Sequence, residues 1–179
     1  MIALKSLRRF GRAKQGLAAL EFAILAPMMV FLLFASVDLI DMLGANKRAQ
    51  NVAASLADVI ARDTEVSNAE VVGLWSAANV LMFPNDSATM QIRITSVSIT
   101  AANGARVVWS EGHGGMSART TNSPVTLPAA MMQNGTSVIM TETIYPYRSP
   151  LGFLAPGPVS MRHDAYRRSR LVDPIPRVS

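Results

Sequence analysis

Residues 17–37 decide the fold, and their sequence is LAALEFAILAPMMVFLLFASV. Glu21 is the one charged residue in this stretch, and the 16 residues from Phe22 to Val37 carry no charge. A helix of 21 residues spans about 31 Å, close to the thickness of the hydrocarbon core of a bilayer. Backbone groups in lipid must form their hydrogen bonds within the chain, so a helix is the expected conformation. The stretch therefore predicts a transmembrane helix.

The charges around this stretch predict its orientation. Five basic residues and no acidic residue precede it: Lys5, Arg8, Arg9, Arg12 and Lys14. They account for the net charge of +5, because the rest of the chain holds 12 basic and 12 acidic residues. Basic residues mark the cytoplasmic side of a membrane helix. We therefore predict a basic cytoplasmic leader at residues 1–16, a transmembrane helix at 17–43 and an extracytoplasmic α+β domain at 44–179. Equal numbers of basic and acidic residues outside the leader also argue against a nucleic-acid partner, which would require a basic surface on the folded domain.

Two other interpretations of residues 17–37 remain open at this point. The first is the buried core helix of a soluble protein, although the uncharged run is long for such a helix. The second is a cleaved secretory signal, which requires small residues at the −3 and −1 positions of the cut. The candidate sites near Ala35 and Gly44 each place a bulky residue at −3.

A sequence pattern lies where the leader meets the apolar stretch. Gly16 is followed by four apolar residues and then Glu21, as in a prepilin-type processing site. Because glycine has no Cβ, it allows the backbone to enter a narrow protease site. Cleavage after Gly16 would free the α-amine of Leu17 and make Glu21 the fifth residue. A carboxylate in a membrane helix is costly and is a functional candidate by default. In a helical filament Glu21 would pair with the α-amine of a neighbouring subunit; the alternative is that it stays hydrated at the membrane surface.

The segment from Gly16 through Glu21, Phe22 and Pro27 resembles the N-terminus of TadE/TadG-like proteins, the pseudopilins or minor pilins of tight-adherence (Tad, or Flp) type IV pilus systems. The strong resemblance covers residues 9–45, and a weaker one continues through 48–84 and 145–147. The chain is too short for the von Willebrand-type domain of some TadG-like proteins, and it has no Asp-x-Ser-x-Ser motif.

The resemblance implies a non-catalytic protein of the bacterial inner membrane that crosses it once, with a periplasmic domain that supports pilus biogenesis and adherence. Its implied partners are a prepilin peptidase, other pilin or pseudopilin subunits, the inner-membrane assembly platform and membrane lipid. Gly16 and Leu17 would form the processing site, Glu21 and Phe22 would serve recognition and assembly, and Pro27 would kink the helix. Incorporation into a surface pilus stays open, and an unprocessed, signal-anchored periplasmic scaffold or adaptor is the alternative.

The rest of the chain predicts a small α+β head. Residues 45–62 lack Gly and Pro and place four apolar residues on one helical face: Val52, Leu56, Val59 and Ile60. We expect the transmembrane helix to continue through them, and two helices with a break near Gly44 are the alternative. A capping box at Ser67 and Glu70 predicts a second helix that ends by Phe83, with one face formed by Leu74, Trp75, Ala78 and Leu81.

Four strands are expected after this helix. The first covers residues 90–99, where the apolar phase shifts before Val97 and predicts a bulge. Asn103-Gly104 predicts a hairpin to a strand around Trp109. Further strands are expected at 137–147 and 159–171. The predicted architecture is thus a long helix that continues into an antiparallel, pilin-like sheet with a second helix.

No catalytic, cofactor-binding or metal-binding residues are predicted. The chain has no cysteine, and its two histidines, His113 and His163, lie in a glycine-rich loop and in a basic strand. A metal site needs more ligands at suitable spacing. A cluster of arginines near the C-terminus (Arg162, Arg167, Arg168, Arg170 and Arg177) is typical of a charged edge strand, and an acidic partner or lipid headgroup is the sharper alternative. A membrane-anchored enzyme would require a convergent polar cluster in the head.

Overall fold

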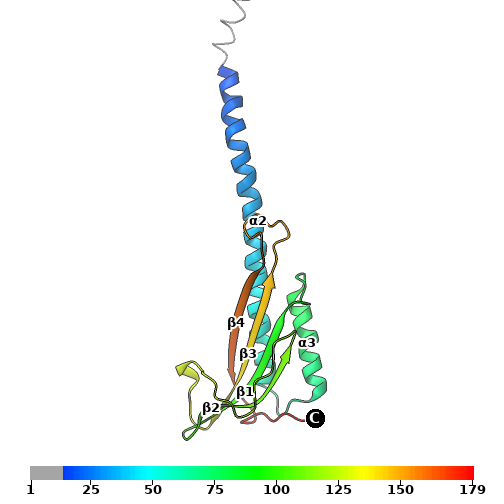
Figure 1. Ribbon diagram of the computed structural model, residues 1–179, viewed down its shortest axis with the longest axis vertical. Coiled ribbons are helices and arrows are strands. Elements are labelled where there is room, and N and C mark those ends of the chain that lie inside the picture. Colours follow the sequence, from blue (N-terminus) through cyan, green and yellow to red (C-terminus); the bar gives the residue numbers. More distant parts are fainter. Residues whose placement is uncertain (1–13) are drawn as a thin grey trace, which may run out of the picture.

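The computed structural model describes residues 14–179, with side chains from residue 17 onward, so residues 1–13 of the predicted leader lie outside the described part. The elements in chain order are α2 (Lys14–Ile60), α3 (Asn68–Met82), β1 (Gln91–Thr100), β2 (Gly104–His113), the 3-10 helix η1 (Ala129–Met131), β3 (Thr136–Tyr147) and β4 (Val159–Arg168). The N-terminal part of α2 projects alone, and its second part lies along the sheet with α3 beside it (Figure 1). The predicted α+β fold is confirmed.

Helix α2 is one uninterrupted helix of 47 residues, so the alternative of a break near Gly44 is wrong. The predicted boundary between residues 43 and 44 falls inside it. Within the described residues, α2 is the one helix that is long and apolar enough to cross a membrane. None of its most apolar 18-residue window is buried, so this stretch is not part of the core of the described chain, and its exposure suggests a single-pass membrane anchor.

The second part of α2 is the spine of the head, because it packs on β3, β4 and α3. Its buried stripe repeats every three or four residues, as expected of a helix with one buried face: Ala45, Ala49, Val52, Ala53, Leu56, Ala57 and Ile60. The alanines allow the sheet to approach the helix closely. The prediction that Val59 belongs to this face was wrong, since Val59 is 54% exposed beside the groove between α2 and α3.

The four strands form one antiparallel sheet in the order β2-β1-β3-β4. The hairpin predicted at Asn103-Gly104 joins β1 to β2, and Gly104 has the positive φ of 65° that favours glycine. The predicted bulge lies at the expected place, between Ser96 and Val97, but the extra residue is Val108 on β2. The pairing of β1 with β3 keeps one register throughout.

The apolar phase shift along β1 therefore has a different cause from the one predicted. Ile92 and Ile94 belong to the large core cluster between the sheet and the helices. Val97 and Ile99 belong to a second, smaller cluster, which includes Leu127 from the segment between β2 and β3. Alternate residues of a strand face opposite sides of the sheet. The sequence pattern thus records two cores on the two faces of one strand.

Helix α3 begins at the predicted capping box. The Glu70 amide donates to Ser67 Oγ at 3.3 Å, and the Ser67 amide donates to Glu70 Oε2 at 2.6 Å. The hydrogen bonds from Ser67 lower the pKa of Glu70. The helix ends at Met82, as predicted, but its buried face consists of Val71, Leu74, Ala78 and Met82. Leu81 is 38% exposed and was wrongly assigned to that face.

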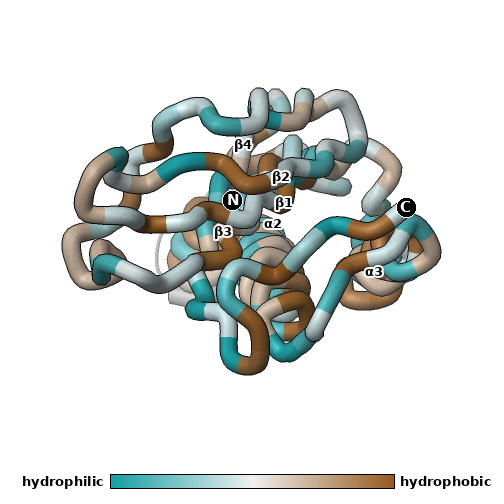
Figure 2. The backbone as a smooth tube through the Cα atoms, turned by 90° about the horizontal axis from the view of Figure 1, so that it is seen from below, coloured by the Kyte–Doolittle hydropathy of each residue, from teal (hydrophilic) through white to brown (hydrophobic). Residues whose placement is uncertain are grey.

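Strand β4 forms an edge of the sheet and ends at Arg168, three residues before the predicted end. After it, the C-terminal segment runs back beside the start of α3 (Figures 1 and 2), where Val66 and Arg177 form a parallel bridge. The buried Trp109 indole donates from Nε1 to the carbonyl oxygen of Ile175 at 2.8 Å. The chain end is thereby fixed to the far end of the head.

Candidate functional site

The bond predicted to be cut, Gly16–Leu17, lies in the first turn of α2, which begins at Lys14. In a helix each carbonyl points toward the amide four residues further on, so a protease must unwind this turn to reach the bond. Glycine lowers helix stability by about 1 kcal/mol relative to alanine. The first turn also has no acidic residue to balance the helix dipole. Both features make the turn easier to unwind.

Glu21 and Phe22 lie one turn further along and face the surroundings. Phe22 is 66% exposed and Leu17 is 59% exposed, and Glu21 is exposed as well. Residues four apart share one face of a helix, so Leu17 and Glu21 lie on the same side of α2. Among the side chains that the structure describes, none forms an ion pair with Glu21. With respect to the described side chains, the carboxylate is therefore open to a second molecule.

Pro27 lies inside α2, and the helix continues on both sides of it. Because proline has no amide hydrogen, one hydrogen bond of the helix is missing at this point. The predicted kink stays a prediction.

Sequence reasoning missed the joint between the helix and the head. Asp38 directly follows the apolar stretch, yet it is only 2% exposed. Its carboxylate accepts hydrogen bonds from the Ser149 hydroxyl and from the amides of Phe153 and Leu154, at 3.0 and 2.8 Å for the two amides. These donors belong to the β3–β4 loop (residues 148–158). The signal in the sequence was an aspartate at the end of a membrane span, but its partners are more than a hundred residues away.

A second contact at the same joint involves Tyr147, at the end of β3. Its hydroxyl donates to Asp41 Oδ2 at 2.7 Å, and the side chain is 1% exposed. Burial, together with this hydrogen bond to a carboxylate, raises the pKa of Tyr147 to about 12. The aspartates that follow the apolar stretch therefore connect α2 to the head.

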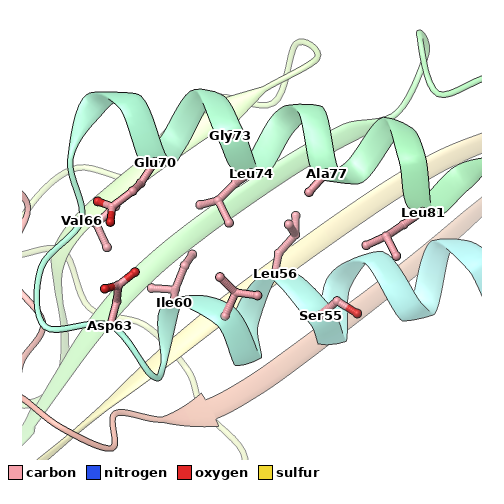
Figure 3. A pocket seen from close by; sticks show the side chains of 11 residues that line it. Ser55, Leu56, Ile60, Asp63, Val66, Glu70, Gly73, Leu74, Ala77 and Leu81 are labelled. Atoms are coloured by element: carbon pink, nitrogen blue, oxygen red, sulfur yellow. The ribbon is translucent and has the colours of Figure 1, made fainter.

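An apolar groove of about 300 Å³ lies between the second part of α2 and α3. Leu56 and Ile60 project into it from α2, and Leu74 and Leu81 project from α3 (Figure 3). Asp63 and Glu70 stand at one end and are the charged residues of its lining. The lining is thus mainly apolar, with two carboxylates at one end.

Two carboxylates of the head, Glu142 and Asp58, each pair with more than one arginine. Glu142 accepts from Arg93 at 2.6 and 2.7 Å and from Arg119 at 3.0 Å. Burial raises the pKa of Glu142, but the hydrogen bonds and charges of these two arginines outweigh it and lower the pKa. Asp58 pairs with Arg62, Arg167 and Arg170.

Three of the five C-terminal arginines, Arg167, Arg170 and Arg177, thus have acidic partners within the head, whereas Arg168 donates to the Gln133 side chain and to the Ala130 carbonyl oxygen. Arg177 contacts Glu111 at 2.9 Å, and β4 is an edge strand, which agrees with the interpretation of a charged edge.

The two histidines lie in different parts of the head. His113 stacks on Trp75, with 4.8 Å between the ring centroids, and His163 Nε2 lies 3.0 Å from Asn46 Oδ1. Among the described residues, no three His, Cys, Asp or Glu side chains are grouped so that they could hold a metal ion.

Comparison with known proteins finds a match for the N-terminal part of the chain. Residues 16–58 match the protein-family model described as TadE-like protein. The match begins at Gly16, covers the whole apolar stretch and ends in the spine of the head. No curated protein and no solved structure matches the chain. The resemblance predicted from the sequence is therefore confirmed over this segment.

Proposed function

Because residues 16–58 are TadE-like, we propose that this protein is a pseudopilin or minor pilin of a Tad (Flp) pilus assembly system. It is inserted with its N-terminus in the cytoplasm and its head in the periplasm, and a prepilin peptidase cuts it after Gly16. The protein then acts without catalysis in pilus biogenesis and adherence, in contact with other pilin or pseudopilin subunits and with the inner-membrane assembly platform.

One observation carries the proposal: the exposed apolar stretch of α2, residues 17–37, bears a single carboxylate, Glu21, on the face that Leu17 also occupies. Cleavage leaves the α-amine of Leu17 at the start of this helix. An ammonium and a carboxylate in a low-dielectric surrounding attract strongly, and each removes the cost of burying the other. Pairing between neighbouring subunits would align their helices by one fixed offset, which is the property that an assembling subunit needs.

The test separates processing from assembly. Gly16→Val should block cleavage, because a branched side chain then stands beside the bond, whereas Gly11→Val in the same leader should leave cleavage intact. Glu21→Gln should be cleaved at the normal site but should fail to crosslink to other subunits, because its neutral amide gives the amine of a neighbour no counter-charge.

The matched control is Glu65→Gln, which changes an exposed acid on the head. Immunoblotting measures the size of the product, and crosslinking in cells measures assembly. A Glu21→Gln protein that assembles as well as the Glu65→Gln control would refute the pairing. A protein that keeps full size and full function in Gly16→Val cells would favour the unprocessed scaffold.

A further inference from the structure

We propose that the β3–β4 loop (residues 148–158) inserts into the periplasmic leaflet as a second membrane-embedded element beside α2. The proposal rests on α2 spanning the membrane, as under the proposed function. The acyl chains of the lipid contact the exposed face of the loop.

The first argument is the depth of the loop. The Phe153 ring packs against Phe31 and Phe34 of α2, with centroids 5.1 and 5.9 Å apart. Phe31 precedes Val37, the end of the apolar stretch, by six residues, which corresponds to about 9 Å along the helix. When residues 17–37 fill a hydrocarbon core of about 30 Å, Phe153 lies below the membrane surface. Figure 1 shows the loop beside α2 above the end of the sheet.

The second argument is the composition of the loop. Residues 151–158 (LGFLAPGP) carry no charge, and Arg148, the one charged residue of the loop, stands at its beginning. Leu151, Phe153 and Leu154 are 48%, 46% and 46% exposed. Apolar side chains that project together from a short loop are unfavourable in water and favourable in lipid. They continue the apolar surface of Phe31 and Phe34, which are 50% and 42% exposed.

The third argument is the backbone of the loop, because irregular backbone at membrane depth requires its polar groups to be satisfied by protein. The amides of Leu151 and Gly152 donate to Ser149 Oγ at 3.2 and 2.9 Å. The amides of Phe153 and Leu154 donate to Asp38. Three further positions of the loop are prolines (150, 156 and 158), which have no amide hydrogen. The loop therefore turns the amides of residues 151–154 inward and exposes the apolar side chains of Leu151, Phe153 and Leu154.

The buried Asp38 fits the same arrangement. A carboxylate at the edge of a membrane span normally faces water, and removing it from water is costly unless it is hydrogen-bonded. Here the three donors of the loop take the place of water. Asp38 thus anchors the loop to α2, and the loop shields Asp38 from lipid.

The absence of cysteine from the chain allows a direct test with single spin labels on the full-length protein. Leu154→Cys places the label on the loop. Ile24→Cys, at a position 67% exposed in the apolar stretch, is the control for the membrane interior, and Val72→Cys, at a position 63% exposed on α3, is the control for water. Each labelled protein is reconstituted in vesicles of phosphatidylethanolamine and phosphatidylglycerol. The accessibility of each label to oxygen and to a neutral nickel chelate is then measured by EPR.

We expect the Leu154 label to be about tenfold less accessible to the chelate than the Val72 label, because hydrocarbon excludes polar solutes, and to be readily accessible to oxygen, like the Ile24 label. A Leu154 label as accessible to the chelate as the Val72 label, while the Ile24 label is shielded, would overturn the loop proposal and leave the membrane span intact. An unshielded Ile24 label would overturn both. Shielding of the Leu154 label that disappears when the protein is diluted in lipid would assign the loop to a second copy and would also overturn the proposal.

Discussion

Replacing Asp38 by alanine should release the β3–β4 loop from α2 and leave the rest of the head folded. The carboxylate accepts two amide hydrogen bonds, from Phe153 and Leu154, and one hydroxyl bond from Ser149. Hydrogen bonds to charged groups contribute about 1.5–3 kcal/mol each. Because water solvates the amides once the loop opens, we expect a net loss of about 2–3 kcal/mol in the free energy that holds the loop closed.

A loss of this size raises the exchange rate of the loop amides by roughly 30- to 150-fold. Hydrogen–deuterium exchange of the full-length protein in detergent, read by mass spectrometry on peptides that cover residues 149–158, measures it. Asp41→Ala is the matched control, because it removes the acceptor of the Tyr147 hydroxyl and no acceptor of a loop amide. Unchanged exchange in Asp38→Ala, or an equal increase in Asp41→Ala, would refute the anchoring role of Asp38.

Three further predictions concern the head. Leu56→Ala removes a side chain that is 1% exposed and should cost about 2–5 kcal/mol in thermal unfolding, whereas Val59→Ala, at a 54% exposed position, should cost well under half as much; equal losses would contradict the assigned core. The pKa of Tyr147 is raised from 10.0 to about 12 in the folded protein. Its contribution to the free energy of unfolding should therefore be fully present below about pH 10 and should decrease as the pH rises to about 12, because the unfolded state loses the proton first. Urea titrations across this range should show a shallower decline in Tyr147→Phe, and identical slopes would speak against the burial of this hydroxyl. Because the pKa of Glu142 is lowered, its contribution to the free energy of unfolding should be present above pH 4.5 and lost as the pH falls through the folded pKa. Glu142→Gln should be less stable by about 1–3 kcal/mol at pH 7 and should lose this acid dependence. An unchanged acid transition would contradict the role of the pair with Arg93.

Most of the architecture could be predicted because it is encoded locally. The apolar run of residues 17–37, the capping box at Ser67 and the Asn103-Gly104 turn each specify a conformation through neighbours in the sequence. The strands at the expected positions and the uninterrupted α2 follow from the same kind of pattern. The errors concern which face of a helix is buried: Val59 and Leu81 were assigned to buried faces, but both are partly exposed along the groove between α2 and α3.

The features at the joint could not be predicted because they depend on residues that are distant in sequence. Asp38 is separated from the Phe153 amide by 115 positions, and Asp41 from the Tyr147 hydroxyl by 106. No periodicity or motif reports such a contact. The bulge was placed correctly but on the wrong strand, since the phase shift in residues 90–99 reflects a second core under the segment that holds Leu127. Gly16, Leu17 and Glu21, by contrast, are singled out by spacing alone, and their roles stay predictions.

The mass of the mature N-terminus tests the central claim most directly. The full-length gene is expressed in cells that contain a prepilin peptidase and in the same cells without it, and the purified proteins are measured by intact-mass and N-terminal peptide mass spectrometry. We predict a polypeptide that begins at Leu17 in the first case and retains residues 1–16 in the second. A protein that keeps its leader in the presence of the peptidase, or that begins at any residue other than Leu17, would contradict the claim.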